Sequence, residues 1–146
     1  MSDPQLTDIL IRFGSALALG ASLGLQREFR GKAAGMRTYS LVTLGAALFT
    51  YLSIYGFSNQ AGADPTRVAA QIVTGIGFLG AGVVIFRPEQ QHIEGLTTAA
   101  GMWVAAAIGM ATGLGMYQVG IVVTLFSLFT LEVLGKIEIT KFKPPK

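Results

Sequence analysis

The amino-acid sequence predicts an all-α fold, a polytopic bundle of about five transmembrane helices. The first observation is composition, since 51% of the residues are hydrophobic and only 13% are charged, with a mean hydropathy of +0.56. A soluble domain carries about 25% charged residues, so about half of the expected surface charge is missing. The second observation is that Asp, Glu, Lys and Arg are absent from three stretches, 38–63, 68–86 and 95–131. Each stretch reaches the roughly 20 apolar residues that a membrane-spanning helix needs.

The longest uncharged stretch, 95–131, is predicted to be a helical hairpin. As a single helix it would extend about 55 Å, whereas the hydrocarbon core of a bilayer is about 30 Å thick. Gly113-Leu114-Gly115 is the expected turn, because glycine gives the backbone the freedom to reverse direction.

A first span is expected at 9–25, where Arg12 lies near enough to the helix start to snorkel to the interface. A cleavable signal peptide is the alternative, because Ala16-Leu17-Ala18 resembles a cleavage triplet. The preceding residues include Asp3 and Asp8, whereas a signal peptide begins with a basic region. The predicted spans are therefore 9–25, 39–56, 68–86, 96–115 and 117–134. Residues 1–135 form the transmembrane domain, and 136–146 form a short basic tail.

The distribution of lysine and arginine predicts the orientation of these spans. With five spans, the first loop, the third loop and the C-terminal tail share one side of the membrane. That side carries most of the cations, whereas the opposite side has Arg67 and, if it snorkels, Arg12. Basic loops stay in the cytosol, so the N-terminus is expected outside and the C-terminus in the cytosol.

The composition also limits the chemistry that the chain can perform. Cysteine is absent, which excludes disulfides, thiolate metal sites and cysteine catalysis. The single histidine, His92, lies in a loop beside Glu94 and reads as a solvated side chain rather than as a catalytic base. We expect no enzyme activity, no cofactor, no metal site and no nucleic-acid partner.

Glycine is abundant inside the predicted spans, with 19 residues in the chain. Small residues allow helices to approach closely in lipid, so helix packing is the expected role of Gly20, Gly24, Gly75, Gly77, Gly80 and Gly82. Locally unwound helix around a buried site is the alternative, because glycine-interrupted spans mark binding sites in transporters. Residues 75–80 also match the dinucleotide fingerprint G-x-G-x-x-G. The match is discounted because it lies inside an uncharged span, without the strand and acid that the motif requires.

Polar residues inside or beside the spans are candidates for function because they are costly in lipid. Gln71 and Thr74 lie three residues apart, on one face of the third predicted helix. Thr97 and Thr98 lie where the fourth helix begins, and Asp64 precedes Pro65 as an expected N-cap. Interhelical hydrogen bonds and ordinary capping are the alternatives at each of these positions.

The first loop holds the densest group of charges. Four cations and one acid, Glu28, lie between Arg27 and Arg37. Topology and attraction to anionic lipid, about 1 kcal/mol per cation, account for part of this pattern. A specific site is the alternative, because Arg37 directly precedes an uncharged span and could pair with Glu28. Such a pair would hold the first two helices in register.

Three sequence blocks resemble the MgtC/SapB family of bacterial inner-membrane proteins. The first is AGMRT at 34–38, followed by LVTLGAALF at 41–49. The second is DPTRVAAQIV at 64–73, continuing into GIGFLGAG at 75–82. The third is GLTTAA at 95–100 with Trp103 and AAIG at 106–109. The resemblance covers about residues 20 to 120, in order and at the family's spacing.

The resemblance implies a multi-pass protein of the bacterial inner membrane that is linked to growth in low magnesium and to survival inside macrophages. It implies a non-enzymatic regulator that binds other membrane proteins such as ATP synthase, with a magnesium or other ion transporter as the alternative. Longer relatives append a cytosolic domain, so this chain is expected to be a short SapB-like member or an isolated membrane domain. Matching positions carry over as functional candidates, namely Arg27, Arg37, Thr38, Asp64, Arg67, Gln71 and Thr97. Gln26 departs from the acid that commonly precedes the arginine in relatives.

Self-association is expected as well. Five glycine-rich spans in a small chain bury little surface alone, and small-residue faces favour helix contact. A two-fold homodimer is the predicted assembly, because that symmetry is the commonest among oligomers.

Overall fold

The computed structural model describes residues 5–56, 64–87 and 92–136. It contains α1 (Leu6–Phe29), α2 (Met36–Tyr55), α3 (Thr66–Val83), α4 (Leu96–Gly113) and α5 (Tyr117–Phe129). A π-helical turn, η2 (Thr130–Leu134), continues α5. Five helices in the described residues are long and apolar enough to cross a membrane. The predicted all-α fold of five transmembrane helices is confirmed.

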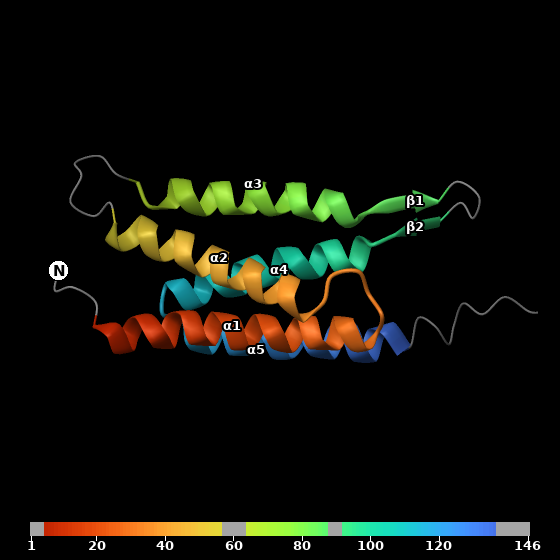
Figure 1. Cartoon of the computed structure of the whole chain (residues 1–146), viewed down its shortest axis with the longest axis horizontal. Coiled ribbons are helices and arrows are strands. Elements are labelled where there is room, and N and C mark those ends of the chain that lie inside the picture. The colour runs from red at the N-terminus through yellow and green to blue at the C-terminus, as the bar shows by residue number, and fades with distance from the viewer. Residues whose placement is uncertain (1–4, 57–63, 88–91, 137–146) are drawn as a thin grey trace, which may run out of the picture.

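The helices are arranged in three layers (Figure 1). α1 and α5 form one layer, α3 forms the opposite one, and α2 and α4 cross each other between them. α4 contacts all four other helices, and half of its span is buried. The span of α3 is only 6% buried, and that of α5 with η2 is 11% buried. The chain therefore has a tight core of α1, α2 and α4, with α3 and α5 on its periphery.

The third predicted span, 68–86, is too long at its C-terminal end. α3 ends at Val83, and β1 (Ile85–Arg87) then pairs with β2 (His92–Glu94) as an antiparallel ribbon. The reason is the β-branched run that ends in Ile85, because such residues favour extended backbone. A charge count could not separate this apolar strand from a helix.

The predicted hairpin between the last two spans is present. α4 ends at Gly113, α5 begins at Tyr117, and Gly115 has a φ of +81°. This left-handed conformation strains any residue with a Cβ, so glycine is the residue that fits. The turn leaves α4 and α5 antiparallel and in contact.

Candidate functional site

A buried arginine marks one end of the bundle, which we call the basic end and which carries Arg27, Arg30, Lys32 and Arg37. Arg27, in the last turn of α1, is only 5% exposed. Its Nη2 donates a hydrogen bond of 2.7 Å to Oγ1 of Thr98 in the first turn of α4. Tyr39, fully buried on α2, lies beside Arg27 and donates to the Thr98 carbonyl oxygen at 3.3 Å. Three helices therefore meet at one guanidinium.

The charge of Arg27 is not balanced by an acid in the part of the chain that the structure describes. Its Nε is buried and has no hydrogen-bond partner there. The start of α4 is also the positive end of that helix dipole, which disfavours a nearby cation. The hydroxyl oxygens of Thr98 and of the neighbouring Tyr39 therefore have to stabilise a charge that is expensive to bury.

A second polar group joins α1 to the end of α5 at the basic end. Glu132 accepts hydrogen bonds from Gln26 Nε2 at 3.2 Å and from Arg30 Nη2 at 2.6 Å. Lys136 Nζ lies 2.9 Å from the same carboxylate. Glu132 lies in the π-helical turn η2, and such turns are frequent at functional positions. Gln26 acts as a donor to this carboxylate.

The predicted pair between Arg37 and Glu28 does not form. Glu28 Oε2 instead accepts a hydrogen bond of 3.0 Å from the backbone N–H of Met36. This contact caps the first turn of α2, whose N–H groups have no partner within the helix. Glu28 therefore does join α1 to α2, but through the backbone. The Arg37 guanidinium remains exposed at the basic end.

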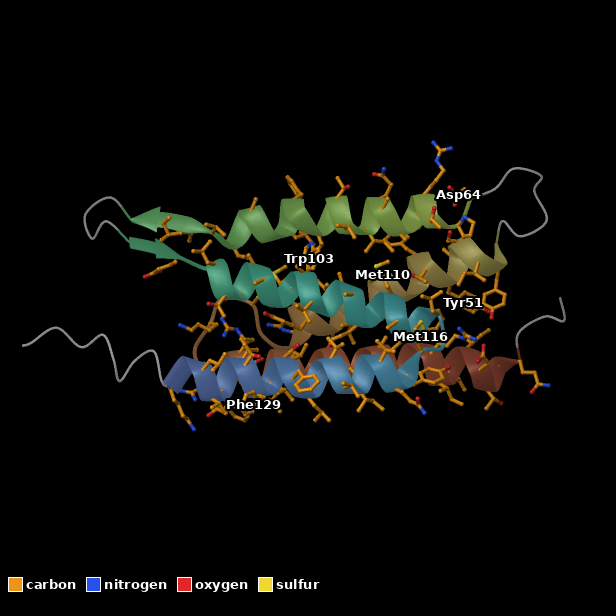
Figure 2. The ribbon with its side chains drawn as sticks, turned by 180° about the vertical axis from the view of Figure 1, so that it is seen from behind. Tyr51, Asp64, Trp103, Met110, Met116 and Phe129 are labelled. Atoms are coloured by element: carbon orange, nitrogen blue, oxygen red, sulfur yellow. The ribbon has the colours of Figure 1, made fainter. Side chains whose placement is uncertain are left out.

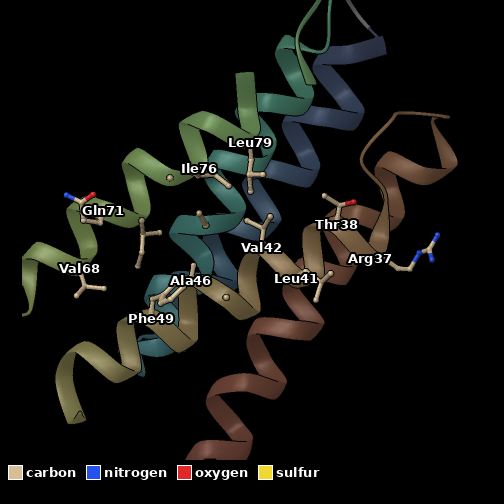
Figure 3. Close-up of a pocket in the computed structure, with 14 residues that line it drawn as sticks. Arg37, Thr38, Leu41, Val42, Ala46, Phe49, Val68, Gln71, Ile76 and Leu79 are labelled. Carbon is tan, nitrogen blue, oxygen red and sulfur yellow. The ribbon is translucent and has the colours of Figure 1, made fainter. Parts of the chain in front are cut away.

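A groove lies between α2 and α3, with a cavity volume of about 810 Å³. Figure 3 shows the apolar side chains of both helices facing each other across it. Arg37 and Thr38 line one end of the groove, and Gln71 lines its margin on α3. The groove exists because α2 inclines away from α3 toward the basic end (Figure 1). At the other end Ser53 Oγ donates to the Pro65 carbonyl oxygen at 2.9 Å and holds the two helices together.

The side of α3 that faces away from the bundle is its open face, formed by Gln71, Thr74, Gly77, Phe78 and Ala81, all exposed. The Thr74 hydroxyl donates to the Ala70 carbonyl oxygen within the helix at 3.1 Å. The Gln71 amide has no hydrogen-bond partner among the described residues. It lies about 7 Å into a helix that is about 27 Å long. Polar side chains in membrane spans are costly unless they find a partner.

The opposite end of the bundle, the Arg12 end, is held by a second arginine. Arg12 Nε lies 2.7 Å from Asp8 Oδ2, and Nη1 donates to the Gly113 carbonyl oxygen at 2.7 Å. Nη2 donates to the Tyr55 hydroxyl at 3.3 Å. Arg12 therefore satisfies a carbonyl at the end of α4, and its snorkelling to the interface stays a prediction.

Asp64 forms the turn before α3, also at the Arg12 end (Figure 2). Its Oδ1 accepts hydrogen bonds from the Thr66 hydroxyl at 2.6 Å and from the Thr66 backbone N–H at 2.9 Å. These bonds, the hydroxyl first, lower the pKa of Asp64 below its ordinary value. Arg67 is exposed one residue further on. Asp3 and Pro4, the same pair of residues near the N-terminus, lie outside the described residues.

A sequence model of the MgtC family matches residues 13–140. The chain belongs to the MgtC/SapB family. Its multi-pass membrane architecture agrees with the resemblance seen in the three sequence blocks.

Several curated members of the MgtC/SapB family are similar to the chain. YhiD of Escherichia coli K12, whose name proposes a magnesium transporter, is 51% identical over 124 residues, covering 82% of this chain and 56% of YhiD. SapB of Bacillus subtilis is 39% identical over 132 residues, covering 87% and 56%. MgtC of Brucella abortus is 46% identical over 113 residues, covering 76% and 44%. The chain spans about half the length of these relatives. No solved structure shows a significant match to it.

The family motifs fall on three places in the fold. Arg27 and Thr98 meet at the basic end, although Thr97, the neighbour of Thr98, points outward and is exposed. Arg37, Thr38 and Gln71 border the groove. Asp64 and Arg67 lie apart from both, at the Arg12 end.

The glycines of this MgtC-family chain divide into two groups. Gly20 and Gly24 lie directly against α2, with no room for a Cβ, and Gly80 faces Ala99 of α4. Gly75, Gly77 and Gly82 have no described atom within 4 Å of an added Cβ. These three glycines of α3 therefore pack against no described helix of this chain. Their predicted role in helix packing stays a prediction for contacts with another chain.

Sequence reasoning missed several residues of the basic end. Tyr39, Arg30 and Glu132 were not among the candidate site residues. A signal for Tyr39 and Glu132 was present in the sequence, because both place polar atoms at the basic end of an apolar span, as Arg27 does. Their partners depend on how each helix is rotated, which a single sequence does not reveal.

Proposed function

We propose that this MgtC-family protein is a non-enzymatic regulator of the bacterial inner membrane that binds another membrane protein through the open face of α3. The observation that carries the proposal is the Gln71 amide, which faces the membrane without a partner among the described residues. Polar groups inside spans are costly and usually find partners. A partner helix that offers a donor and an acceptor to Gln71 would remove this cost.

The remaining residues of the open face support a helix as the partner. Thr74, Gly77 and Ala81 are small and exposed, and small residues let two backbones approach closely in lipid. Phe78 is 81% exposed beside them and supplies the apolar area that such a contact would cover. The resemblance suggests ATP synthase as one partner, and a second copy of the chain suits the same face.

The arrangement of polar residues also favours binding over catalysis. The contacts at the basic end join arginine to threonine, glutamine to glutamate, and tyrosine to backbone. Each of these contacts ties one helix to another. They fit a rigid scaffold that presents α3, which is the property a binding protein requires.

Photocrosslinking from two matched phenylalanines tests the proposal. Benzoyl-phenylalanine is placed at Phe78 on α3 or at Phe126 on α5, which is 69% exposed, and native membranes are irradiated. We expect a membrane protein, identified by mass spectrometry, to be captured from position 78. The product should be lost with Gln71→Leu and retained with Gln118→Leu, an exposed amide only one residue into α5. Equal capture from positions 78 and 126, or capture from position 78 that is unchanged by Gln71→Leu, would contradict the proposal.

Magnesium transport is the second candidate, because the name of YhiD proposes it. Magnesium is usually held by one or two carboxylates and keeps octahedral oxygen coordination. The described residues contain no group of three or more His, Cys, Asp or Glu side chains that could hold a metal ion. We therefore expect proteoliposomes that contain the chain and a magnesium-sensitive dye to match empty liposomes. Uptake above that level, abolished by Gln71→Ala or Thr97→Ala, would favour the transporter.

A further inference from the structure

The groove between α2 and α3 lies inside the membrane rather than at its surface. Both of its walls are transmembrane helices, and most of the residues that line it are apolar. On α2 the lining runs from Arg37 to Phe49, which is about 18 Å of helix. A single leaflet of the hydrocarbon core is about 15 Å thick. The groove therefore has the length of one acyl chain.

The lining of the groove favours an acyl chain as its occupant. It is apolar apart from Arg37, Thr38 and Gln71, and its volume of about 810 Å³ is that of a binding site. Acyl chains surround the protein at high concentration, so they are the molecules best placed to fill the groove.

The charge at the mouth of the groove selects among lipids. Glu28 is engaged by the Met36 backbone, and Arg30 is paired with Glu132. Arg37, in contrast, has no acidic partner among the described residues. Figure 3 shows it at one end of the groove, with its guanidinium directed away from the apolar lining. A phosphate at the membrane surface would meet the guanidinium there, with the exposed Lys32 on the preceding loop.

We propose that the groove binds one acyl chain of an anionic phospholipid whose phosphate is held by Arg37. The Thr38 hydroxyl, on the same turn, is a further donor at the mouth. This site goes beyond the proposed regulatory function, because it uses the side of α3 that faces α2 and shares with the open face only Gln71, at the margin of the groove. Bound lipid would fill the space that α2 leaves and hold α3 in place.

Glycines on both sides of α3 allow a matched test. Gly75 lines the groove and Gly77 belongs to the open face, and neither has a described atom within 4 Å of an added Cβ. Gly75→Leu would fill the groove, and Gly77→Leu would leave it open. Gly45→Leu fills the groove from α2, where an added side chain also meets open space. If both variants lose the lipid, a folding defect in one of them does not explain the loss. Arg37→Gln removes the phosphate partner, with Arg67→Gln at the Arg12 end as its control.

The measurement is native mass spectrometry of the purified protein titrated with phosphatidylglycerol or with phosphatidylcholine. We expect the wild type, Gly77→Leu and Arg67→Gln to hold one phosphatidylglycerol in preference to phosphatidylcholine. Arg37→Gln should bind phosphatidylglycerol about tenfold more weakly, as expected for the loss of a charged hydrogen bond. Gly75→Leu and Gly45→Leu should lose both lipids while keeping the wild-type circular dichroism spectrum.

Three outcomes would overturn the lipid site. One is a wild type that shows no preference for the anionic lipid. Another is undiminished lipid binding by both groove-filling variants. The third is a second copy or another protein that occupies the groove, seen as a complex that Gly75→Leu and Gly45→Leu dissociate and Gly77→Leu does not. Loss of the photocrosslink from position 78 with normal lipid binding would count against the proposed partner face alone.

Discussion

Thr98 shows how one hydroxyl can determine whether a buried charge is tolerated. It lies 71 positions from Arg27 in the sequence and 2.7 Å from it in the fold. Both residues could be selected from the sequence as polar candidates near span ends. Their pairing could not be selected, because it depends on the rotation of α1 and α4 about their own axes. The same limit applies to Gln26, whose contact with Glu132 spans 106 positions.

Replacing Thr98 by valine should destabilise the protein, because the buried guanidinium would lose its hydroxyl acceptor. The expected loss is about 1.5–3 kcal/mol, the usual range for a hydrogen bond to a charged group. Thr97→Val, at the adjacent exposed position, should change stability by less than about 0.5 kcal/mol. Thr98→Ser should restore most of the loss. Thermal unfolding in detergent measures all three variants, and equal effects at positions 97 and 98 would refute this role for Thr98.

At the scale of the helices, the surroundings of the glycines distinguish the packed helix α4 from the peripheral helix α3. Gly101, Gly109 and Gly113 place α4 against α2 with no space for a side chain. On α3 the same residue type mostly faces open space. The sequence predicted packing for Gly20 and Gly24 of α1 and for the glycines of α3 alike, because composition records where small residues occur and not whether a neighbour is present. The β1–β2 ribbon was missed for a related reason, since apolar strand and apolar helix look the same in a charge count.

Gly109→Ala should therefore be far more damaging than Gly45→Ala. A Cβ at position 109 would collide with the Thr43 carbonyl oxygen, whereas position 45 has open space. Forcing extra atoms into a packed core costs about 1–3 kcal/mol, while Gly45→Ala improves helix propensity. We expect a lower Tm for Gly109→Ala and an unchanged or higher Tm for Gly45→Ala. Similar melting temperatures for the two variants would mean that α2 and α4 can separate without penalty.

For the molecule as a whole, composition and charge-free stretches were sufficient to predict the number of spans and the fold class. The arrangement of the spans was not predicted, because a uniformly apolar helix gives no signal for which side faces lipid. The same uniformity explains why the peripheral position of α3 emerged only from the fold. Orientation and assembly belong to this scale and remain predictions.

Orientation can be tested with single cysteines, since the chain has none of its own. Gln5 and Ala33 are exposed at the Arg12 end and the basic end, respectively. The positive-inside rule places the basic end in the cytosol. An impermeant thiol reagent applied to intact cells should therefore label Gln5→Cys and spare Ala33→Cys, with both labelled after lysis. Labelling of Ala33→Cys alone in intact cells would show that the orientation is the reverse of the predicted one.

Assembly can be tested by mass. If two copies meet through the open face of α3, native mass measurement in mild detergent should show a species at twice 15.4 kDa. Gly77→Leu, which enlarges that face, should shift the balance toward the monomer, whereas Gly14→Leu, in open space on α1, should not. A purely monomeric wild type at every concentration would disprove the dimer.

The two arginines of α1, Arg12 and Arg27, together fix the length over which α1 and α4 are held side by side. Arg12 holds the last residue of α4 and Arg27 holds its first turn, so the helices are fastened head to tail at both ends. Fifteen positions separate Arg12 from Arg27, and fifteen separate Thr98 from Gly113. At 1.5 Å per residue both intervals are about 22 Å. A deletion in one helix alone would leave one fastening out of register. In a membrane whose thickness does not suit this fixed interval, the whole bundle has to tilt or the membrane has to deform, because α1 and α4 cannot adjust separately.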